Sequence, residues 1–381
     1  MKQTVLRIAL TGGGSGGHIY PLVAVAEALE KLMAEKKIYG EIRYFGPVDN
    51  YRNVLEGVGV QITPILSGKI RRYFSLSNIL DIPKVVLGSV QAFFKLFWFM
   101  PDVLFSKGGA GAFPTVLAAR FYRIPVIIHE SDAQPGLNNL LSAPFANRIA
   151  VSFERALHYF NPRKTAWVGN PIRSSLLGER FPQERAKEEL GFNAAEPLVV
   201  ILGGSQGAQR INELVILVLK DLIQITQVLH QTGTANFSEI QKLSRTVLLD
   251  VPIKTEIKNR YQAVPYLEDD FKAAFTAADL VVARAGSSIF EISAFSKPSI
   301  LIPLSGSAND HQRRNAYEFA RTGAAIIIEE INLLPGIFLH EIGDTLKNQE
   351  LLNTMSLASG KFFKPQAAEI LAEEILRMTG A

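Results

Sequence analysis

The sequence has no cysteine in its 381 residues. This absence excludes a disulfide scaffold, a thiol nucleophile and a cysteine-ligated metal site, and it is compatible with a reducing cytoplasm. Charged residues make up 20% of the chain and hydrophobic residues 48%, a composition typical of globular proteins rather than disordered ones. Because the chain is long for a single hydrophobic core, we expect two domains.

Basic residues are too few and too dispersed to indicate a nucleic-acid partner. The net charge of +4 permits anionic ligands, but no dense lysine and arginine stripe with interleaved aromatics occurs, so we expect no nucleic-acid binding. Metal-ligand spacings such as H-E-x-x-H are also missing, and the sequence implies no metal.

Long uninterrupted apolar runs are missing as well. The most apolar stretch, residues 85–100, contains Gln91 and Lys95 and is shorter than the ~18 residues that a spanning helix needs. Two interpretations of the surrounding segment, Ile70 to Met100, stay open. It is either a core helix or an interfacial patch whose aromatics enter the headgroup region while cations meet anionic lipid. Those cations are Arg71, Arg72, Lys84 and Lys95.

A glycine-rich stretch, Thr11 to Tyr20, lies between the apolar run Val5 to Leu10 and a helical pattern that begins at Pro21. The opening residues lead directly into it without a cleavage site, so we expect a first strand rather than a signal peptide. A strand, a glycine turn and a helix form a phosphate-binding arrangement. The spacing also matches G-x-G-x-x-G, which keeps a dinucleotide site open, but no lysine followed by Ser or Thr closes a P-loop.

His18 lies within this stretch, at the expected start of the helix. The helix dipole disfavours the imidazolium form there, which suits a neutral base working near pH 7. A histidine that only caps or packs is the alternative. Both interpretations stay open on the residues alone.

Strand-like apolar runs alternate with helical patterns in both halves of the chain, which predicts parallel sheets with helices on both faces. We expect an α/β protein with two doubly wound, Rossmann-like domains facing a central cleft. The predicted domains are residues 1–170 and 171–364, with a last helix at 365–381 packing back on the first. The expected strands are 5–10, 41–45, 103–106, 126–129, 198–202, 227–230, 280–283, 299–302 and 325–328.

Three further motifs carry groups suited to a nucleotide sugar. GGSQGAQ, from Gly203, offers backbone N–H groups and a hydroxyl to a diphosphate. ARAGSSIFE, residues 283–291, offers two serines to phosphate and Glu291 to ribose hydroxyls, and NDHQRRNA, residues 309–316, offers amides and a carboxylate to a sugar. The alternatives are a tight turn, a helix cap and a solvated loop. HES-DAQPG, residues 129–136, brings His129, Glu130 and Asp132 together at a strand end.

Seven motifs occur in a fixed order: TGGGSGGHIYPLVAVAEAL, GGAGAFP, HESD with PGLNN, VGNPIR, GGSQGAQRIN, ARAGSSIFE and DHQRRNA. In this order they resemble the MurG family of N-acetylglucosaminyltransferases, which make lipid II for peptidoglycan. The resemblance implies the GT-B fold, UDP-N-acetylglucosamine as donor, and undecaprenyl-pyrophosphoryl-MurNAc-pentapeptide (lipid I) as acceptor. It also implies inverting transfer without an essential metal or other cofactor, a peripheral place on the cytoplasmic face of the plasma membrane, and cell-wall synthesis proteins as partners.

The resemblance also implies residue roles. It assigns the base for the acceptor 4-hydroxyl to His18. It assigns the acceptor diphosphate to Gly13, Gly14, Gly108 and Gly109. The donor would be bound by Ser15, Gly16, Gly17, Asp132, Arg173, Ser205, Leu267, Ser287, Ser288, Glu291 and Gln312.

The chain departs from the family pattern in three places. Ala110 stands where tyrosine is common, Asp132 where some members have asparagine, and the segment 286–291 is one residue shorter than in many members. Asp132 or Glu130 is the competing base. The rival functions are another GT-B enzyme, such as a different lipid glycosyltransferase or a UDP-sugar 2-epimerase, an NAD-dependent oxidoreductase and a non-catalytic membrane scaffold.

Overall fold

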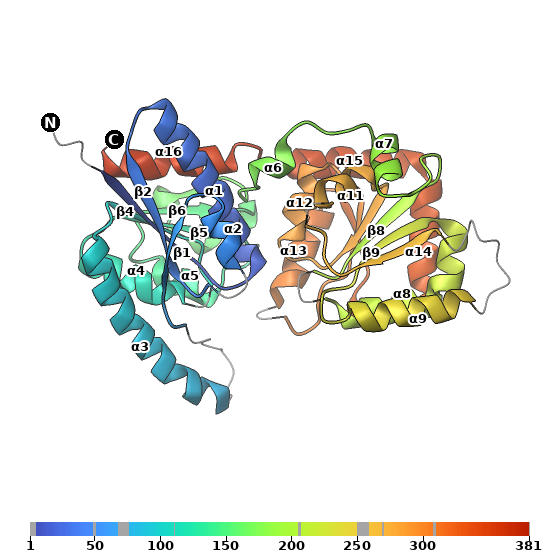
Figure 1. Cartoon of the computed structure of the whole chain (residues 1–381), viewed down its shortest axis with the longest axis horizontal. Coiled ribbons are helices and arrows are strands. Elements are labelled where there is room, and N and C mark those ends of the chain that lie inside the picture. The colour runs from blue at the N-terminus through green and yellow to red at the C-terminus, as the bar shows by residue number, and fades with distance from the viewer. Residues whose placement is uncertain are drawn as a thin grey trace. The chain divides into compact units, whose positions relative to one another are not determined.

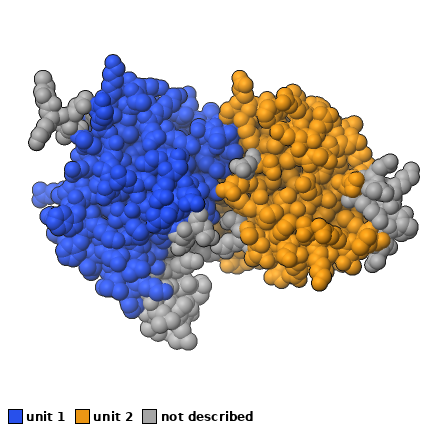
Figure 2. All heavy atoms as spheres, in the orientation of Figure 1, with its two compact units in different colours: residues 1–177, 364–381 blue, residues 178–363 orange. Residues whose placement is uncertain are grey.

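The computed structural model describes residues 5–48, 51–67, 76–109, 111–204, 207–249, 259–268, 270–307 and 310–380, with 76–82 as backbone only. The chain forms two compact units (Figure 2). Unit 1 comprises residues 1–177 and 364–381, and unit 2 comprises residues 178–363. The chain therefore leaves unit 1, builds unit 2 and returns.

Unit 1 contains a parallel sheet of seven strands in the order β3-β2-β1-β4-β5-β6-β7 (Figure 1). Its strands are β1 (Leu6–Thr11), β2 (Gly40–Gly46), β3 (Gln61–Pro64), β4 (Val103–Ser106), β5 (Val126–Glu130), β6 (Arg148–Val151) and β7 (Thr165–Trp167). Its helices are α1 (Gly16–Glu35), α2 (Arg52–Glu56), α3 (Leu76–Phe99), α4 (Ala112–Phe121), α5 (Leu137–Ser142), η2 (Glu154–Tyr159), η3 (Pro162–Lys164), α6 (Ser174–Leu177) and α16 (Ala367–Thr379).

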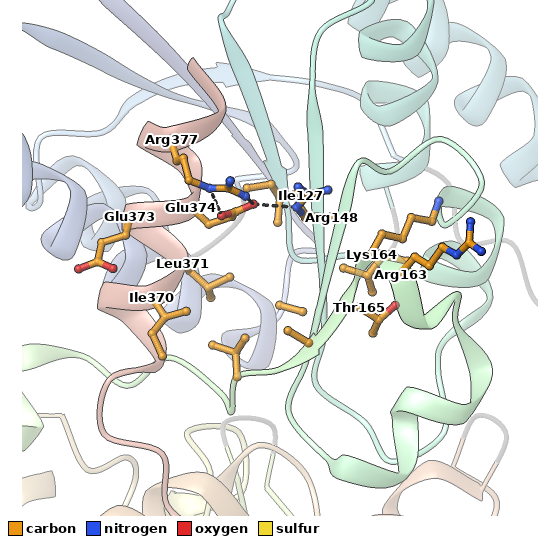
Figure 3. Close-up of a pocket in the computed structure, with 14 residues that line it drawn as sticks. Ile127, Arg148, Arg163, Lys164, Thr165, Ile370, Leu371, Glu373, Glu374 and Arg377 are labelled. Atoms are coloured by element: carbon orange, nitrogen blue, oxygen red, sulfur yellow. Dashed lines mark hydrogen bonds and ion pairs between the residues drawn. The ribbon is translucent and has the colours of Figure 1, made fainter. Parts of the chain in front are cut away.

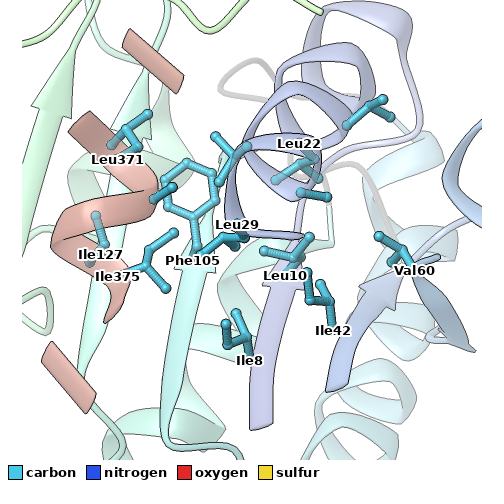
Figure 4. Packing of buried hydrophobic residues seen from close by; sticks show 14 of the residues in the cluster. Ile8, Leu10, Leu22, Leu29, Ile42, Val60, Phe105, Ile127, Leu371 and Ile375 are labelled. Carbon is cyan, nitrogen blue, oxygen red and sulfur yellow. The ribbon is translucent and has the colours of Figure 1, made fainter. Parts of the chain in front are cut away.

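Alternation along β1 builds a core on each face of this sheet, because successive side chains of a strand point to opposite sides. Ile8 and Leu10 pack with α1 and α16 on one face (Figure 4). Ala9 packs on the other face with residues of α3 and α4, among them Leu96 and Val116. The predicted doubly wound fold is thus confirmed for this half.

The boundary between the units lies at residues 177 and 178, not at 170 and 171 as the sequence predicts. Two contacts hold the extra segment on α1. The Arg173 guanidinium lies 4.1 Å above the Tyr20 ring, and the Ser174 N–H donates to Glu27 Oε2 at 2.8 Å. The turn after Gly169-Asn170-Pro171, which suggested a domain boundary, is therefore internal to unit 1.

Unit 2 repeats the arrangement with six parallel strands in the order β10-β9-β8-β11-β12-β13. Its strands are β8 (Leu198–Leu202), β9 (Gln227–Gln231), β10 (Tyr261–Val264), β11 (Leu280–Ala283), β12 (Ser299–Leu301) and β13 (Ala325–Ile327). Its helices are α7 (Gln183–Glu189), α8 (Gln209–Ile225), α9 (Phe237–Leu249), α11 (Phe271–Ala277), α12 (Ser288–Ala294), α13 (His311–Ala320), η5 (Glu330–Asn332), α14 (Pro335–Lys347) and α15 (Gln349–Phe362).

Helix α3 satisfies parts of both interpretations of its segment. Ala92, Leu96 and Phe99 are buried in the core of unit 1, whereas Phe94 is 61% exposed and Trp98 81% exposed. Among the side chains that the structure describes, the further exposed hydrophobic residues of the helix and of neighbouring α4 are Val86, Leu87, Val90, Phe97, Leu117 and Phe121. We call these eight exposed residues the apolar patch.

Three of the four cations expected to meet lipid either make a hydrogen bond within unit 1 or lie outside the described residues. The Lys95 ammonium donates to the Pro64 carbonyl at 2.5 Å, so it is engaged within unit 1, and its contact with lipid stays a prediction. Arg71 and Arg72 lie outside the described residues. Within the part of the chain that the structure describes, no helix is both long and apolar enough to cross a membrane.

Candidate functional site

Strand order places the ligand-binding loops, because ligands of doubly wound sheets bind beyond the carboxyl ends of the strands where the chain reverses direction across the sheet. In unit 1 that switch point lies between β1 and β4, and in unit 2 it lies between β8 and β11. Each of these strands is followed by a predicted glycine or serine motif. Each unit therefore carries one set of predicted ligand-binding loops, which we call its half-site.

In the half-site of unit 1, the turns after β1 and β4 touch each other through glycine. Gly109 has φ +84°, and a Cβ atom there would lie 2.8 Å from His18 Nε2 and 2.9 Å from the backbone nitrogen of Gly13. Only a residue without a side chain fits such an approach. The structure thus brings together His18 and the two glycine pairs, Gly13-Gly14 and Gly108-Gly109, that the resemblance assigns to one ligand.

His18 lies in the first turn of α1, which begins at Gly16 rather than at Pro21. Its Nδ1 is 2.8 Å from the Ser15 hydroxyl. Ser15 is the N-cap residue, yet its side chain makes no capping bond, because the hydroxyl is directed to the imidazole instead. When Nδ1 carries the proton and donates it to Ser15 Oγ, Nε2 has the lone pair that a base needs. That lone pair is on the side of Gly109.

Glu130 fixes the loop that follows β5. Its carboxylate accepts hydrogen bonds from the N–H groups of Asp132 (2.9 Å) and Gly136 (3.0 Å) and from Asn139 Nδ2 (2.9 Å). Burial and the nearby Asp132 raise the pKa of this carboxyl. Both oxygens are occupied and the residue is buried, so this geometry favours a structural role for Glu130 over the role of competing base. Asp132 is half-buried in the same loop.

His129 is fully buried and holds the chain where it turns toward residue 173. Its Nε2 donates to the Gly169 carbonyl at 2.9 Å. Burial, followed by the charge of Lys107, lowers the pKa of His129 well below its usual value, so the ring is neutral. Lys107, directly after β4, was missed from the sequence. A lysine between a buried strand and two glycines is the signal that could have found it.

In the half-site of unit 2, the turn after β8 is held against the end of β9. The Gly203 N–H donates to the Gln231 carbonyl at 3.0 Å, and the Gly207 N–H donates to the Gly204 carbonyl at 3.1 Å. A Cβ atom on Gly207 would lie 2.6 Å from the Thr232 carbonyl. Ser205, predicted to bind phosphate, lies outside the described residues, as does Ala110.

The segment after β11 places Ser287 before the first residue of α12, Ser288, with Glu291 half-buried about one turn later. The Ser288 hydroxyl donates to the Arg284 carbonyl at 2.8 Å, so its proton is already engaged. Arg284 also anchors the next loop through Glu330, with 2.6 Å between Nη2 and Oε1.

Glu330 also accepts the Ser305 N–H at 3.0 Å. Burial alone would raise the pKa of Glu330, but the bonds from Arg284 and Ser305 outweigh it and the pKa is lowered. The carboxylate is therefore a fixed anchor for the loop after β12. Sequence reasoning missed this ion pair, since its partners are 46 residues apart.

Glutamine side chains make hydrogen bonds at two more residues that are predicted to bind the donor. The Leu267 N–H donates to Gln231 Oε1 at 3.1 Å. The Leu267 carbonyl is then the backbone group of this residue that can contact the uracil of the nucleotide. Gln312, in the first turn of α13, accepts the Leu304 N–H at 3.0 Å through Oε1. Its side-chain nitrogen is the group that could donate to a sugar hydroxyl. Arg173 belongs to unit 1, where it stacks on Tyr20.

A pocket of about 410 Å³ lies elsewhere in unit 1, between α16 and the strands β5 to β7 (Figure 3). Its floor is apolar, with Ile127 and Leu371, and its rim carries the ion pair of Arg148 with Glu374, 2.9 Å apart. None of the predicted site residues lines it. Among the residues that the structure describes, no group of three or more His, Asp or Glu is placed to hold a metal ion.

Comparison with known proteins assigns both halves of the chain to one glycosyltransferase family. Residues 8–151 match the glycosyltransferase family 28 N-terminal domain, and residues 198–371 match the family 28 C-terminal domain. A relative from Treponema denticola is 33% identical, with 96% of each chain covered, and is named UDP-N-acetylglucosamine--N-acetylmuramyl-(pentapeptide) pyrophosphoryl-undecaprenol N-acetylglucosamine transferase.

Solved structures share the fold over nearly the whole chain. MurG of Acinetobacter baumannii has a TM-score of 0.72 at 24% identity, covering 98% of this chain and 99% of that one. The UDP-GlcNAc 2-epimerase of Neisseria meningitidis, bound to UDP-GlcNAc, has a TM-score of 0.68 at 13% identity, covering 98% and 100%. Both likenesses show the two-domain GT-B fold alone, and the sequence relative decides between the families. The chain belongs to the MurG family of glycosyltransferases.

Proposed function

We propose that this protein transfers N-acetylglucosamine from UDP-N-acetylglucosamine to the 4-hydroxyl of MurNAc in lipid I, with inversion, to give lipid II. The observation that carries the proposal is the 33% identity to a transferase of that name over 96% of both chains. The half-site of unit 1 supports it, because His18 lies against a pair of glycine turns suited to a diphosphate.

The mechanism follows from where charge develops. As the bond to UDP breaks, negative charge grows on the diphosphate and the sugar becomes oxocarbenium-like. The proposed groups that stabilise the leaving diphosphate are Arg173, the hydroxyls of Ser205 and Ser287, and the backbone N–H groups of Ser288 and of the turn after β8. No step is assigned to a metal ion, and a metal-independent reaction stays a prediction.

The acceptor hydroxyl must lose its proton as it attacks. We assign this proton to Nε2 of His18, whose Nδ1 is oriented by Ser15 at 2.8 Å. Attack from the face opposite the leaving group inverts the anomeric centre. Asp132 is the remaining carboxylate candidate, since both oxygens of Glu130 are bound within its own loop.

Product analysis tests the function. The purified protein is incubated with labelled UDP-N-acetylglucosamine and a short-chain lipid I analogue, with and without a chelator. In both reactions we expect two products, a labelled β-linked disaccharide and free UDP. Conversion of the donor to its 2-epimer without transfer would instead support the epimerase fold relatives, and loss of transfer with the chelator alone would contradict the metal-independent mechanism.

Glu291 gives a prediction for donor recognition. Replacing Glu291 by alanine should weaken UDP binding by about 10- to 100-fold, because a hydrogen bond to a charged group contributes about 1.5–3 kcal/mol. Calorimetry should show a much smaller loss for 2′,3′-dideoxy-UDP, which lacks the ribose hydroxyls. Glu350→Ala, an exposed change on α15, is the control. Equal losses for both nucleotides would remove Glu291 from the ribose contact.

We further propose that unit 1 binds the cytoplasmic face of the membrane through the apolar patch, and that cell-wall synthesis proteins are its partners there. Support comes from the lipid-anchored acceptor and from Phe94, Phe97 and Trp98, which are exposed side by side on α3. Aromatic side chains of this kind favour the headgroup region. Arg120 and Arg123, which lie within two residues of Phe121 in sequence, can add attraction to anionic lipid.

The patch gives a prediction for membrane binding. Changing Phe94 and Trp98 together to serine should lower the partition coefficient onto anionic vesicles by about tenfold or more, since burying one large apolar side chain is worth about 1.5–3 kcal/mol. Vesicle sedimentation measures it. Leu217→Ser, an exposed leucine of α8 that is 71% exposed, should leave partitioning unchanged. Undiminished binding by the folded double variant would assign docking to another surface.

A further inference from the structure

One lysine lies buried at the switch point of unit 1. Lys107 follows β4 directly, is 1% exposed, and its Nζ atom has no hydrogen-bond partner among the described residues. An ammonium group is expensive to bury, so a buried lysine is normally paired. Lys187 of unit 2 shows the normal case, because its ammonium lies 2.8 Å from an Asp279 carboxylate oxygen.

The position of Lys107 connects the two glycine turns. Its N–H donates to the Thr11 carbonyl at 2.8 Å, and its Cβ atom lies 3.6 Å from where a Cβ on Gly12 would be. Gly108 and Gly109 come next in the chain. The lysine therefore lies at the base of both turns, beside the start of the 20-residue helix α1.

Two carboxylate groups interact with the Lys107 ammonium. Glu130 and Asp132, at and after the end of β5, both interact with the charge of Lys107, and His18 and neutral His129 are further titratable neighbours. Without the lysine, these carboxylates would repel any anion bound at the turns, because charges in a partly desolvated site are poorly screened.

We propose that Lys107 is a positioning residue of the half-site of unit 1, the acceptor half-site. Its ammonium offsets Glu130 and Asp132 and so allows the two glycine turns to hold the diphosphate of a lipid-linked acceptor. This inference rests on the proposed function. It explains why the ammonium has no hydrogen-bond partner among the described residues: its charge is compensated fully only when an anion occupies the turns.

Lys107→Met tests the inference, since methionine has a similar length and no charge. The acceptor KM should rise about tenfold, the effect of one charge at roughly 10 Å in an effective dielectric near 20, while kcat and the donor KM stay within about twofold. Lys187→Met, the matched buried lysine of unit 2, should leave the acceptor KM unchanged. An unchanged acceptor KM in folded Lys107→Met would overturn the inference.

The wild-type enzyme provides a test that needs no variant. Burial lowers the pKa of Lys107 to about 8, although Glu130 and Asp132 oppose the shift. The ammonium is therefore lost as pH rises through 8, and the acceptor KM should increase there in the wild type but not in Lys107→Met. An acceptor KM that is flat from about pH 7 to 9 would overturn the inference even if the variant did not fold.

Binding of inorganic pyrophosphate, measured by calorimetry with saturating UDP, separates this inference from the proposed function. Weaker binding to Lys107→Met than to the wild type supports the role of the lysine even if no transfer to lipid I is found. Equal binding together with normal transfer by the wild type would reject the role of Lys107 and leave the function intact.

Discussion

Replacing His18 by alanine should lower the rate of sugar transfer by about 10²–10⁴-fold, the usual contribution of a positioned base, and leave UDP affinity nearly unchanged. The structural reason is the place of the imidazole. Its Nδ1 is fixed by Ser15 and its Nε2 is directed to the glycine turn at Gly109. Single-turnover transfer to a lipid I analogue, with UDP calorimetry alongside, measures both quantities.

The pH dependence adds a second criterion. Only neutral imidazole accepts a proton, so the wild-type rate should be higher at alkaline pH than at acidic pH. His158→Ala, on the exposed face of η2, is the matched control and should behave as the wild type. Near-normal chemistry in His18→Ala, combined with loss of transfer in Asp132→Ala, would assign the base to the carboxylate.

Replacing Gly109 by alanine should be nearly as damaging, with transfer reduced by about 10²-fold or more. The added Cβ atom would lie 2.8 Å from His18 Nε2 and 2.9 Å from Gly13, at a φ of +84°. The imidazole or the turn must then move, and a displacement of about 1 Å at a reacting group can cost 10²-fold. Steady-state kinetics with both substrates measures the loss.

Gly136→Ala is the control for this change. Gly136 has φ −68°, and a Cβ atom there would meet nothing within 4 Å. Full activity is expected, with the N–H bond to Glu130 kept. If Gly109→Ala also transfers at the wild-type rate, the close approach of the two turns is not needed for catalysis and the proposed acceptor half-site is wrong.

The central strands could be predicted from sequence because they are buried on both faces. Continuous apolar runs such as Leu198–Leu202 and Leu280–Ala283 leave little ambiguity. The strands that sequence reasoning missed are shorter or carry polar residues. They are β3 (QITP), β6 (RIAV), β7 (TAW) and β10 (YQAV). Three of them lie at the edges of their sheets, where one side lacks a neighbour and the apolar requirement is weaker.

The glycine motifs of the site could also be predicted from the sequence. Glycines at positive φ, such as Gly109 and Gly207, leave a pattern in the sequence because no other residue fits. The side-chain contacts that support these loops leave no such pattern in the sequence. Gln231 holds Leu267, 36 residues away, and Arg284 holds Glu330. These partners meet only because the strand order brings their loops to the same edge of the sheet.

The return of the chain to unit 1 has a consequence for folding during synthesis. Leu371, Ile375 and Leu376 of α16 are almost fully buried in the same core as Ile8 and Leu10 of β1. The core around β1 is therefore completed only after α16, which follows unit 2 in the chain, whereas unit 2 is contiguous and can complete its core earlier. A chain shortened to residue 363 should keep unit 2 folded and expose the apolar face of unit 1 that α16 covers. Unit 2 can thus complete its core before unit 1, although the synthesis of unit 1 begins first.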